Sequence, residues 1–413
     1  MTPDGRFVMT SCASLFAAEF VVNSAAVTDH GSVPIIHWLE DGKAFEARWL
    51  SHSGAPPATR VVVADGKMSA DEAYGLACQG TAILWRGDFQ EARQMLSALG
   101  NRADRRKRSS RTSAATPIAG PADAFHLYRQ ARSQRARTLN SLLIPLNDDY
   151  SIPLPRAPDI RQACVEAYGP AETSSVTSLR ALLGVIGAHE WRTKGIDLPE
   201  AGGRIHPHFG VFAPIRREYV DLIATTPLPA ACASESVAFD IGTGTGVLAV
   251  VLARRGIERV VATDLEPRAL ACARENVRQL GLIERIDVVQ ADLFPEGRAA
   301  LVICNPPWIP ARPSSPMESG IYDPDSQMLR GFLKALPGHL SPGGEGWLIL
   351  SDLAEHLGLR TRASLLEDFA AAGLRVVGRH DVPPRHPRAA DKTDPLHLAR
   401  AAEITSLWRL GAL

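Results

Sequence analysis

A glycine turn between two apolar segments is the first place in the sequence where residue types and spacing indicate chemistry. It is the string Asp240-Ile-Gly-Thr-Gly-Thr-Gly246, which follows a strand pattern and precedes a helix pattern. A strand that passes through such a turn into a helix N-terminus is typical of a nucleotide-type ligand site. Gly242, Gly244 and Gly246 allow the backbone to bend and to lie close to a ligand, because no side chain intervenes.

The spacing of these glycines indicates the kind of ligand. Val247 stands where a dinucleotide fingerprint has its last glycine, and no Lys-Ser or Lys-Thr follows the turn as in a phosphate-binding loop. The turn therefore favours a ligand without a phosphate chain, and Asp240 before it is an acid for a cationic group. S-adenosylmethionine, an adenosine with a sulfonium and an ammonium, fits this description. A nicotinamide oxidoreductase is an alternative that Val247 disfavours.

Acids follow two further strand patterns. Asp264 stands about 20 residues past the glycines, the distance from which an acid reaches ribose hydroxyls. Asp292 follows the next strand pattern, where a carboxylate can accept a hydrogen bond from the adenine amino group. A single acid after a strand is most often only a turn or cap residue. Three acids in register with a glycine turn favour a ligand site at the carboxyl ends of the strands.

The string Asn305-Pro-Pro-Trp308 after another strand pattern is the most specific feature of the sequence. An amide or exocyclic amino nitrogen is a poor nucleophile because its lone pair is delocalised. If the Asn305 side-chain oxygen and the Pro306 carbonyl each accept one N–H, the nitrogen is held with its lone pair directed at the methyl donor. Pro307 stiffens the loop, and Trp308 offers a face for stacking. Catalysis then needs positioning rather than a strong base; a purely structural turn is the alternative.

With these strings identified, residues from about 190 to 413 resemble the class I S-adenosylmethionine-dependent methyltransferases. Within that class they are most similar to the HemK-type N-methyltransferases, which modify a glutamine side-chain amide. The family usually has Tyr where this chain has Trp308. The Asn-Pro-Pro-aromatic string also occurs in enzymes that methylate base amino groups in RNA and DNA, and the first 120 residues match no known part of the family.

The resemblance implies a role for each site residue. The implied cofactor-binding residues are Asp240, Gly242, Thr243, Gly244, Gly246, Asp264, Leu265, Asp292 and Leu293. Within this set the glycine turn holds the methionine part, Asp264 the ribose, and Asp292 with Leu293 the adenine. The implied catalytic residues are Asn305, Pro306, Pro307 and Trp308, of which Asn305 and Pro306 hold the substrate amide.

Strand patterns alternate with helix patterns from Ser236 onward, which predicts a parallel sheet with helices on both faces. The expected fold is therefore α/β, a doubly wound, seven-stranded Rossmann-like methyltransferase sheet preceded by β-rich and helical modules. Helical periodicity is also expected over 122–146 and a strand over 190–196. The expected divisions are 1–100 an N-terminal α+β module, 101–121 a basic linker, 122–189 a helical module, 190–230 a hairpin with a connecting helix, and 231–413 the methyltransferase domain.

A run of arginines between Arg102 and Arg137 has few acids near it in the sequence and forms one positive tract. Such a tract can engage RNA phosphates, although a solvated linker and helix face is the alternative. The expected partner is a macromolecular substrate, with a glutamine amide of a translation-machinery protein favoured by the resemblance and an RNA or DNA base as the alternative. A cofactor-binding module without transfer activity is a further alternative, which the intact Asn305 string disfavours.

The composition favours a soluble, cytoplasmic globular protein. Lys and Arg number 45, as do Asp and Glu, so net charge indicates no class of partner. The six cysteines include no C-x-x-C pair, which suits reduced thiols rather than disulfides or zinc. The mildly apolar segment from Phe7 to Val27 is too interrupted to span a bilayer. It indicates an N-terminal extension or a start codon placed too early, with a cleaved signal peptide as the alternative. His206 and His208 lack an apparent third ligand, so no metal is expected.

Overall fold

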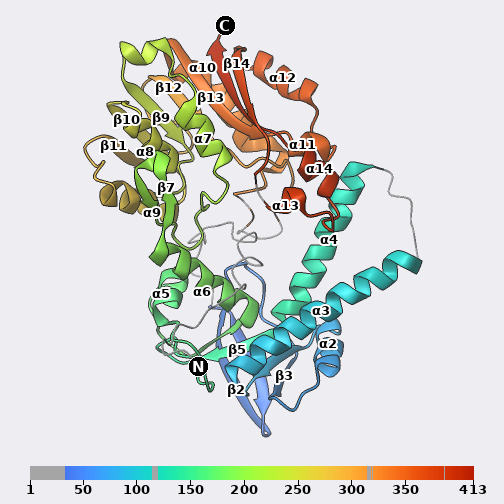
Figure 1. The fold of residues 1–413 in the computed structure, drawn as a ribbon. Helices are drawn as coiled ribbons and strands as arrows, with labels where there is room; N and C mark the ends of the chain where they lie inside the picture. The colour runs from blue at the N-terminus through green and yellow to red at the C-terminus, as the bar shows by residue number, and fades with distance from the viewer. Residues whose placement is uncertain (1–32, 114–119, 314–317, 319, 386) are drawn as a thin grey trace, which may run out of the picture.

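The computed structural model describes residues 33–413, apart from 114–119, 314–317, 319 and 386 (Figure 1). Two larger sheets organise it, one in the lower half of Figure 1 and one in the upper half. A short hairpin of β7 (Ile196–Leu198) and β8 (Gly203–Ile205) connects them in the sequence. The expected N-terminal extension lies outside the described residues. No helix in the described part of the chain is long and apolar enough to cross a membrane.

The upper sheet has the seven strands predicted, in the order β11-β10-β9-β12-β13-β15-β14. Its strands are β9 (Val237–Ile241), β10 (Arg259–Asp264), β11 (Ile286–Gln290), β12 (Ala299–Cys304), β13 (Leu340–Ser351), β14 (Leu374–Val382) and β15 (Thr405–Ala412). The strands from β11 to β13 in this order are parallel, whereas β15 runs antiparallel to both of its neighbours. The predicted doubly wound α/β sheet is therefore confirmed.

Helices cover both faces of this sheet because successive strand residues point to opposite sides. Ala238 and Ile303 pack into one core together with helices α7 and α8, whereas Phe239 and Cys304 pack into a second core with α10 and α12. Cys304 is thus core filling, as its apolar strand predicts. The helices of this half are α7 (Glu218–Thr225), α8 (Val247–Arg254), α9 (Pro267–Gln279), α10 (Gln327–His339), α11 (Leu353–His356), α12 (Arg362–Ala371), α13 (Pro387–Ala390) and α14 (His397–Ala402).

The lower sheet has six strands in the order β1-β2-β6-β5-β4-β3. They are β1 (Ile35–Glu40), β2 (Lys43–Leu50), β3 (Val61–Ala64), β4 (Ala82–Trp85), β5 (Leu142–Leu146) and β6 (Ser175–Ser178). The helices are α2 (Ala70–Cys78), α3 (Phe89–Ser113), α4 (Pro121–Asn140), α5 (Arg161–Tyr168) and α6 (Leu179–Lys194).

This sheet corrects the expected division of the first half of the chain. β4 pairs with β5, and β2 pairs with β6, so the expected α+β module and helical module share one sheet. β4, β5 and β6 were not predicted, because β4 and β5 are apolar runs that periodicity cannot distinguish from buried helix segments, and β6 is a run of only four residues that contains three hydroxyl side chains. The helix expected over 122–146 ends at Asn140 for the same reason, and the strand expected over 190–196 is mostly the end of α6.

The expected basic linker over 101–121 is also wrong in its first part. Helix α3 continues through it to Ser113, and arginine, lysine and alanine are good helix formers. α3 packs along α4, where Arg135 Nε donates to Asp104 Oδ1 at 3.0 Å. Figure 1 shows these two long helices side by side on the right of the lower half, with α4 rising toward α13 and α14.

Candidate active site

The upper sheet brings the predicted site residues to one edge. The last residue of β9 pairs with β10 on one side and with the last residue of β12 on the other. The glycine turn, Asp264 and Asn305 therefore leave three adjacent parallel strands side by side. Asp292 follows β11, the next strand along. This edge is the carboxyl end of the strands, where open α/β sheets bind ligands.

Asp240 stabilises the glycine turn from inside the protein. Its side chain is 1% exposed, and its Oδ2 accepts hydrogen bonds from the Thr243 hydroxyl at 2.6 Å and from the Ala249 N–H at 3.0 Å. Burial raises the pKa of Asp240 to about 6. These contacts fasten the turn to the first turn of α8, so the carboxylate is committed to the protein rather than presented at the surface of the turn.

The glycines of the turn adopt left-handed backbone conformations. At Gly244 φ is 56°, and a Cβ there would meet no atom within 4 Å, so the turn borders open space at this point. At Gly246 φ is 80°, and a Cβ would lie 3.3 Å from Cα of Ala273 on α9. Gly244 therefore leaves room for a ligand, whereas Gly246 allows a helix to pack closely behind the turn.

Asp264 is fixed against the turn by both of its carboxylate oxygens. Oδ2 accepts a hydrogen bond from the Gly244 N–H at 3.0 Å, and Oδ1 accepts one from the Glu266 N–H at 3.0 Å. Burial raises the pKa of Asp264 above its ordinary value. Each oxygen keeps a further lone pair for a ligand. The neighbouring Leu265 is 58% exposed and provides an apolar surface beside the carboxylate.

The loop after β11 completes this side of the site. The Thr263 hydroxyl donates to the Leu293 carbonyl oxygen at 2.6 Å, which ties the loop to β10. Leu293 has a left-handed φ of 67°, a conformation that is uncommon for a leucine and turns the chain sharply at this point. Asp292 beside it is exposed.

Asn305 and Trp308 are joined within the loop after β12. The Trp308 indole N–H donates to Asn305 Oδ1 at 2.9 Å, and both side chains are half-buried. The guanidinium of Arg216 lies over the Trp308 ring, with Cζ 4.9 Å from the ring centre. One face of the indole is therefore covered. The stacking predicted for Trp308 is restricted to its other face.

The end of the same loop caps α10. Asp323 is 5% exposed, and its two carboxylate oxygens accept hydrogen bonds from the N–H groups of Met328 and Leu329, each at 3.0 Å. Asp323 therefore caps the N-terminus of the helix that follows the loop. The Asp323 N–H donates to the Ile309 carbonyl oxygen at 2.9 Å, so the two ends of this loop are held together.

The segment after β8 is attached to the glycine turn by Asn276 of α9. Asn276 is fully buried; its Nδ2 donates to the Thr245 carbonyl oxygen at 3.0 Å, and its Oδ1 accepts from the His206 N–H at 2.8 Å. The imidazoles of His206 and His208 have different partners, the Arg192 carbonyl oxygen and the Glu275 carboxylate, each at 2.6 Å. Within the described ranges, no group of three or more His, Cys, Asp or Glu side chains is placed to hold a metal ion.

Several arginines of the tract form ion pairs with acidic residues that are distant in the sequence. Arg102 pairs with Asp71 at 2.6 Å, and Arg129 of α4 pairs with Glu318 at 3.1 Å. Arg135 pairs with Asp104, as described above. Part of the positive charge expected over this tract is therefore offset within the protein.

Sequence reasoning did not identify Arg216, Glu403 or Asn276 as parts of the site. Arg216 Nη2 donates to Glu403 Oε1 at 3.0 Å across 187 residues of sequence, and no local pattern indicates this pair. The sequence marks Glu403 only as an acid at the start of an apolar strand pattern, which does not indicate a role in the site.

Comparison with known proteins agrees with this geometry. Residues 203–369 match the family described as "Methyltransferase small domain". The chain is 37% identical over 150 residues to a release factor glutamine methyltransferase of Cereibacter sphaeroides, covering 33% of this chain and 51% of the relative. It is 48% identical over 69 residues to a ribosomal protein L11 methyltransferase of Pelotomaculum thermopropionicum, covering 16% of this chain and 22% of the relative. The chain thus spans about half, or less, of the length of these curated relatives.

Among solved structures, a methyltransferase from Pyrococcus furiosus has 19% sequence identity and a TM-score of 0.33, covering 50% of this chain and 91% of that one.

These findings show that part of the chain is similar to methyltransferases, which agrees with the resemblance and with the cofactor, S-adenosylmethionine, expected from the sequence. The residues present fit that cofactor. The turn borders open space at Gly244, where a bulky ligand needs it, and Asp264 presents spare carboxylate lone pairs beside that space.

Proposed function

We propose, from this resemblance, that the chain is an S-adenosylmethionine-dependent N-methyltransferase that acts on a planar nitrogen. The observation that carries the proposal is the placement of Asn305, which leaves the sheet beside the glycine turn with its side-chain oxygen already oriented by Trp308. When bound, S-adenosylmethionine supplies a methyl group activated by a sulfonium. The residues of the protein bind the cofactor, orient the acceptor nitrogen and exclude water.

Binding of the cofactor is assigned to the three strand ends next to Asn305. The backbone from Gly242 to Gly246 borders the methionine part, and Asp264 accepts hydrogen bonds from the ribose hydroxyls. The exposed Leu265, together with the Asp292–Leu293 loop, borders the adenine. Asp240 and Thr243 hold the turn in shape, since their bond lies inside the protein.

Asn305 and Pro306 orient the acceptor nitrogen. A carboxamide oxygen accepts two hydrogen bonds, and the Trp308 indole N–H uses one of them. The remaining lone pair of Asn305 Oδ1 and the carbonyl of Pro306 then accept one N–H each from the acceptor. Pro307 restricts the backbone between Pro306 and Trp308, so the two acceptor oxygens keep their relative position.

The favoured acceptor is a glutamine side-chain amide of a protein of the translation machinery, which places the enzyme in the cytoplasm. The similarity to a release factor glutamine methyltransferase supports this acceptor. A primary amide also presents the two N–H groups that Asn305 and Pro306 require. The ion pairs of Arg102 and Arg129 disfavour an RNA base as the acceptor, because these charges are already partnered.

Transfer of a tritiated methyl group to cell components tests this function. The protein is incubated with labelled S-adenosylmethionine and a lysate from a strain that lacks its gene, and the lysate is then fractionated into protein, RNA and DNA. Label is expected in protein, as methylglutamine after proteolysis. Label in RNA or DNA would replace the acceptor with a base amino group. Cofactor binding without any label would identify a binding module, and preference for NAD(H) would identify an oxidoreductase.

A further inference from the structure

Four side chains form a continuous series of contacts that ends at the proposed catalytic amide. Glu403 accepts a hydrogen bond from Arg216 Nη2 at 3.0 Å, and the Arg216 guanidinium lies over the Trp308 ring at 4.9 Å. The Trp308 indole N–H then donates to Asn305 Oδ1 at 2.9 Å. We call this series the Glu403–Asn305 chain. The four residues come from three separate segments of the sequence, because Trp308 and Asn305 lie in the same loop.

The first member is firmly held. Glu403 is fully buried, and its Oε1 also accepts a hydrogen bond from the Ser351 hydroxyl at 2.7 Å. Ser351 ends β13 and pairs with Thr405 of β15, so the carboxylate is attached to the carboxyl end of β13. A buried carboxylate needs a positive partner, and Arg216 provides it. The position of the guanidinium is therefore determined by the sheet.

The third member is held from several sides. Trp308 packs against both hydrophobic cores of the upper sheet, while Arg216 covers one face of its ring. A guanidinium over an indole is attracted by the negative face of the ring. The ring therefore has little freedom to rotate, and the direction of its N–H is set.

The direction of that N–H decides which way the Asn305 amide faces. The indole nitrogen donates and does not accept, so only the orientation with Oδ1 toward Trp308 forms the bond. The reverse orientation would direct the amide NH₂ at the indole N–H. It would also present donors, instead of an acceptor, to the nitrogen of the substrate.

We infer that Arg216 and Glu403 are positioning residues for methyl transfer: they hold Trp308 so that its indole N–H fixes the orientation of the Asn305 amide. The inference rests on the proposed function. The inference also gives a reason for tryptophan at position 308. Other aromatic residues could stack there, but the indole N–H is the group that donates to Asn305.

The contact itself is tested without measuring activity, by nuclear magnetic resonance of the indole N–H groups of the seven tryptophans. The Trp308 signal is assigned by its loss in Trp308→Phe. In Arg216→Met this signal is expected to shift and to exchange faster with solvent. An unchanged Trp308 signal in Arg216→Met would overturn the inference.

Arg379 offers a matched control. Its guanidinium lies 4.7 Å from the ring centre of Trp408, and its Nε donates to Asp381 at 2.7 Å. Its side chain is 27% exposed, against 24% for Arg216. Arg379→Met removes an equivalent stacked, ion-paired arginine on β14 and is expected to leave the Trp308 signal and methyl transfer unchanged.

Kinetics then separate positioning from binding. Arg216→Met is expected to lower kcat about tenfold, since it removes a cation–π contact and loosens one hydrogen bond, with the Kd for S-adenosylmethionine unchanged. Arg216→Lys keeps the charge beside Glu403 and is expected to retain more activity. In the double variant with Trp308→Phe, replacing Arg216 is expected to add no further loss, because Arg216 acts through Trp308.

The outcomes distinguish this inference from the proposed function. Additive losses in the double variant, or a normal kcat in Arg216→Met with a displaced Trp308 signal, would overturn the positioning role. If the wild-type protein transfers no methyl group to any fraction, the proposed function fails and the positioning role fails with it, whereas the indole signal still decides whether Arg216 holds Trp308.

Discussion

The side chain of Asn305 has two hydrogen-bonding roles in the proposed mechanism. Its oxygen receives the Trp308 N–H and keeps one lone pair for the acceptor. Replacing Asn305 with Ala is therefore expected to lower kcat by at least about a hundredfold, because an uncharged nitrogen loses its positioning partner. The Kd for S-adenosylmethionine, measured by calorimetry, is expected to change less than about threefold, since the glycine turn and Asp264 are unaltered.

Turnover that survives in Asn305→Ala would disprove the mechanism. Asn305→Asp is a useful companion, because its carboxylate can still accept both hydrogen bonds but brings a negative charge.

Asp240 is expected to give the protein a distinct dependence on pH. Burial raises its pKa from an ordinary 3.8 to about 6, so the folded state binds a proton more tightly than the unfolded state does. The unfolding free energy should therefore fall as pH rises between about 4 and 6, by roughly 3 kcal/mol from this group. Asp240→Asn keeps an oxygen for Thr243 and Ala249 but does not titrate.

Urea unfolding of both proteins at several pH values measures this effect. The difference in unfolding free energy, wild type minus Asp240→Asn, is expected to decrease across that pH range. A difference that stays constant with pH would show that the Asp240 carboxyl has an ordinary pKa.

At the scale of elements, the glycine turn is constrained by both its own backbone and the helix behind it. Gly246→Ala would place a methyl group 3.3 Å from Ala273 at a φ of 80°. Gly281→Ala is the matched control, since φ there is 68° and no atom lies within 4 Å. The control is expected to lose about 1 kcal/mol of unfolding free energy from backbone strain, and Gly246→Ala about 2–3 kcal/mol. Equal losses in the two variants would show that α9 moves away without cost.

The sequence predicted those elements that are marked by patterns within their own residues, such as hydrophobic periodicity and turn residues. Strands and helices alternate regularly from Val237 to Gln290, and a further strand ends at Cys304. The glycines and acids follow the strand ends, so the order of the elements predicted that they would lie close together. Three strands of the lower sheet were not predicted, because β4, β5 and β6 are short, fully buried runs that have no period. The contact between Arg216 and Glu403 could not be predicted, since it depends on how segments 187 residues apart meet.

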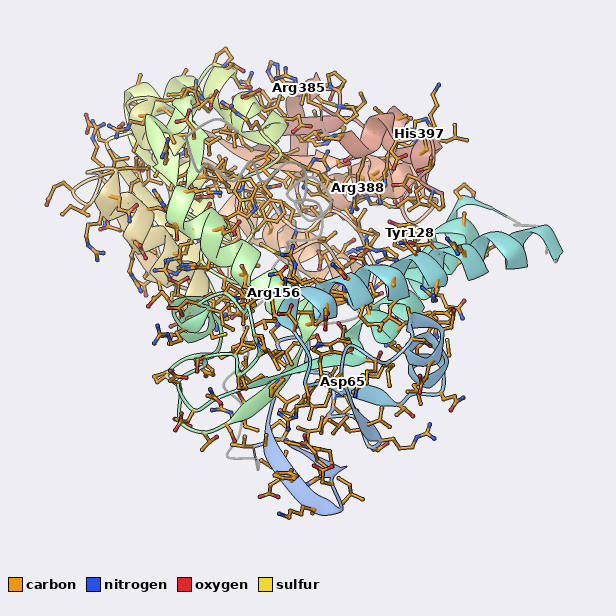
Figure 2. The ribbon with its side chains drawn as sticks, turned by 60° about the horizontal axis from the view of Figure 1, so that its bottom comes forward. Asp65, Tyr128, Arg156, Arg385, Arg388 and His397 are labelled. Atoms are coloured by element: carbon orange, nitrogen blue, oxygen red, sulfur yellow. The ribbon has the colours of Figure 1, made fainter. Side chains whose placement is uncertain are left out.

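At the scale of the whole molecule, α4 joins the lower sheet to the loop that follows the proposed catalytic residues. Phe125 packs with Ile309 and Leu353 in one hydrophobic cluster. Arg129 pairs with Glu318 and lies 4.3 Å from the ring centre of Tyr322. α4 also approaches the C-terminal helices α13 and α14. Figure 2 labels Tyr128 of α4, Arg388 of α13 and His397 of α14. The lower half of the protein therefore supports the loop that follows the proposed catalytic residues.

Loosening this contact is expected to affect the macromolecular acceptor more than the cofactor. Arg129→Met removes an ion pair and a cation–π contact, so kcat/KM for the labelled protein fraction should fall about tenfold, with the Kd for S-adenosylmethionine unchanged. Arg135→Met is the control, because its partner Asp104 lies within the lower half. Equal kinetics for the two variants would show that α4 does not support acceptor binding.

The hydrogen bonds of Asn276 determine how the catalytic half can be separated from the rest of the chain. A fragment beginning at residue 231 would lack the His206 backbone that Asn276 binds. It would also lack α7, whose fully buried Val220 and Ile223 cover one side of the sheet, so that side would be exposed. Such a fragment is expected to aggregate when produced alone. A fragment that starts ahead of β7 keeps these groups and is the shortest expected to be recovered as a monomeric, cofactor-binding protein, which size-exclusion chromatography and calorimetry can establish.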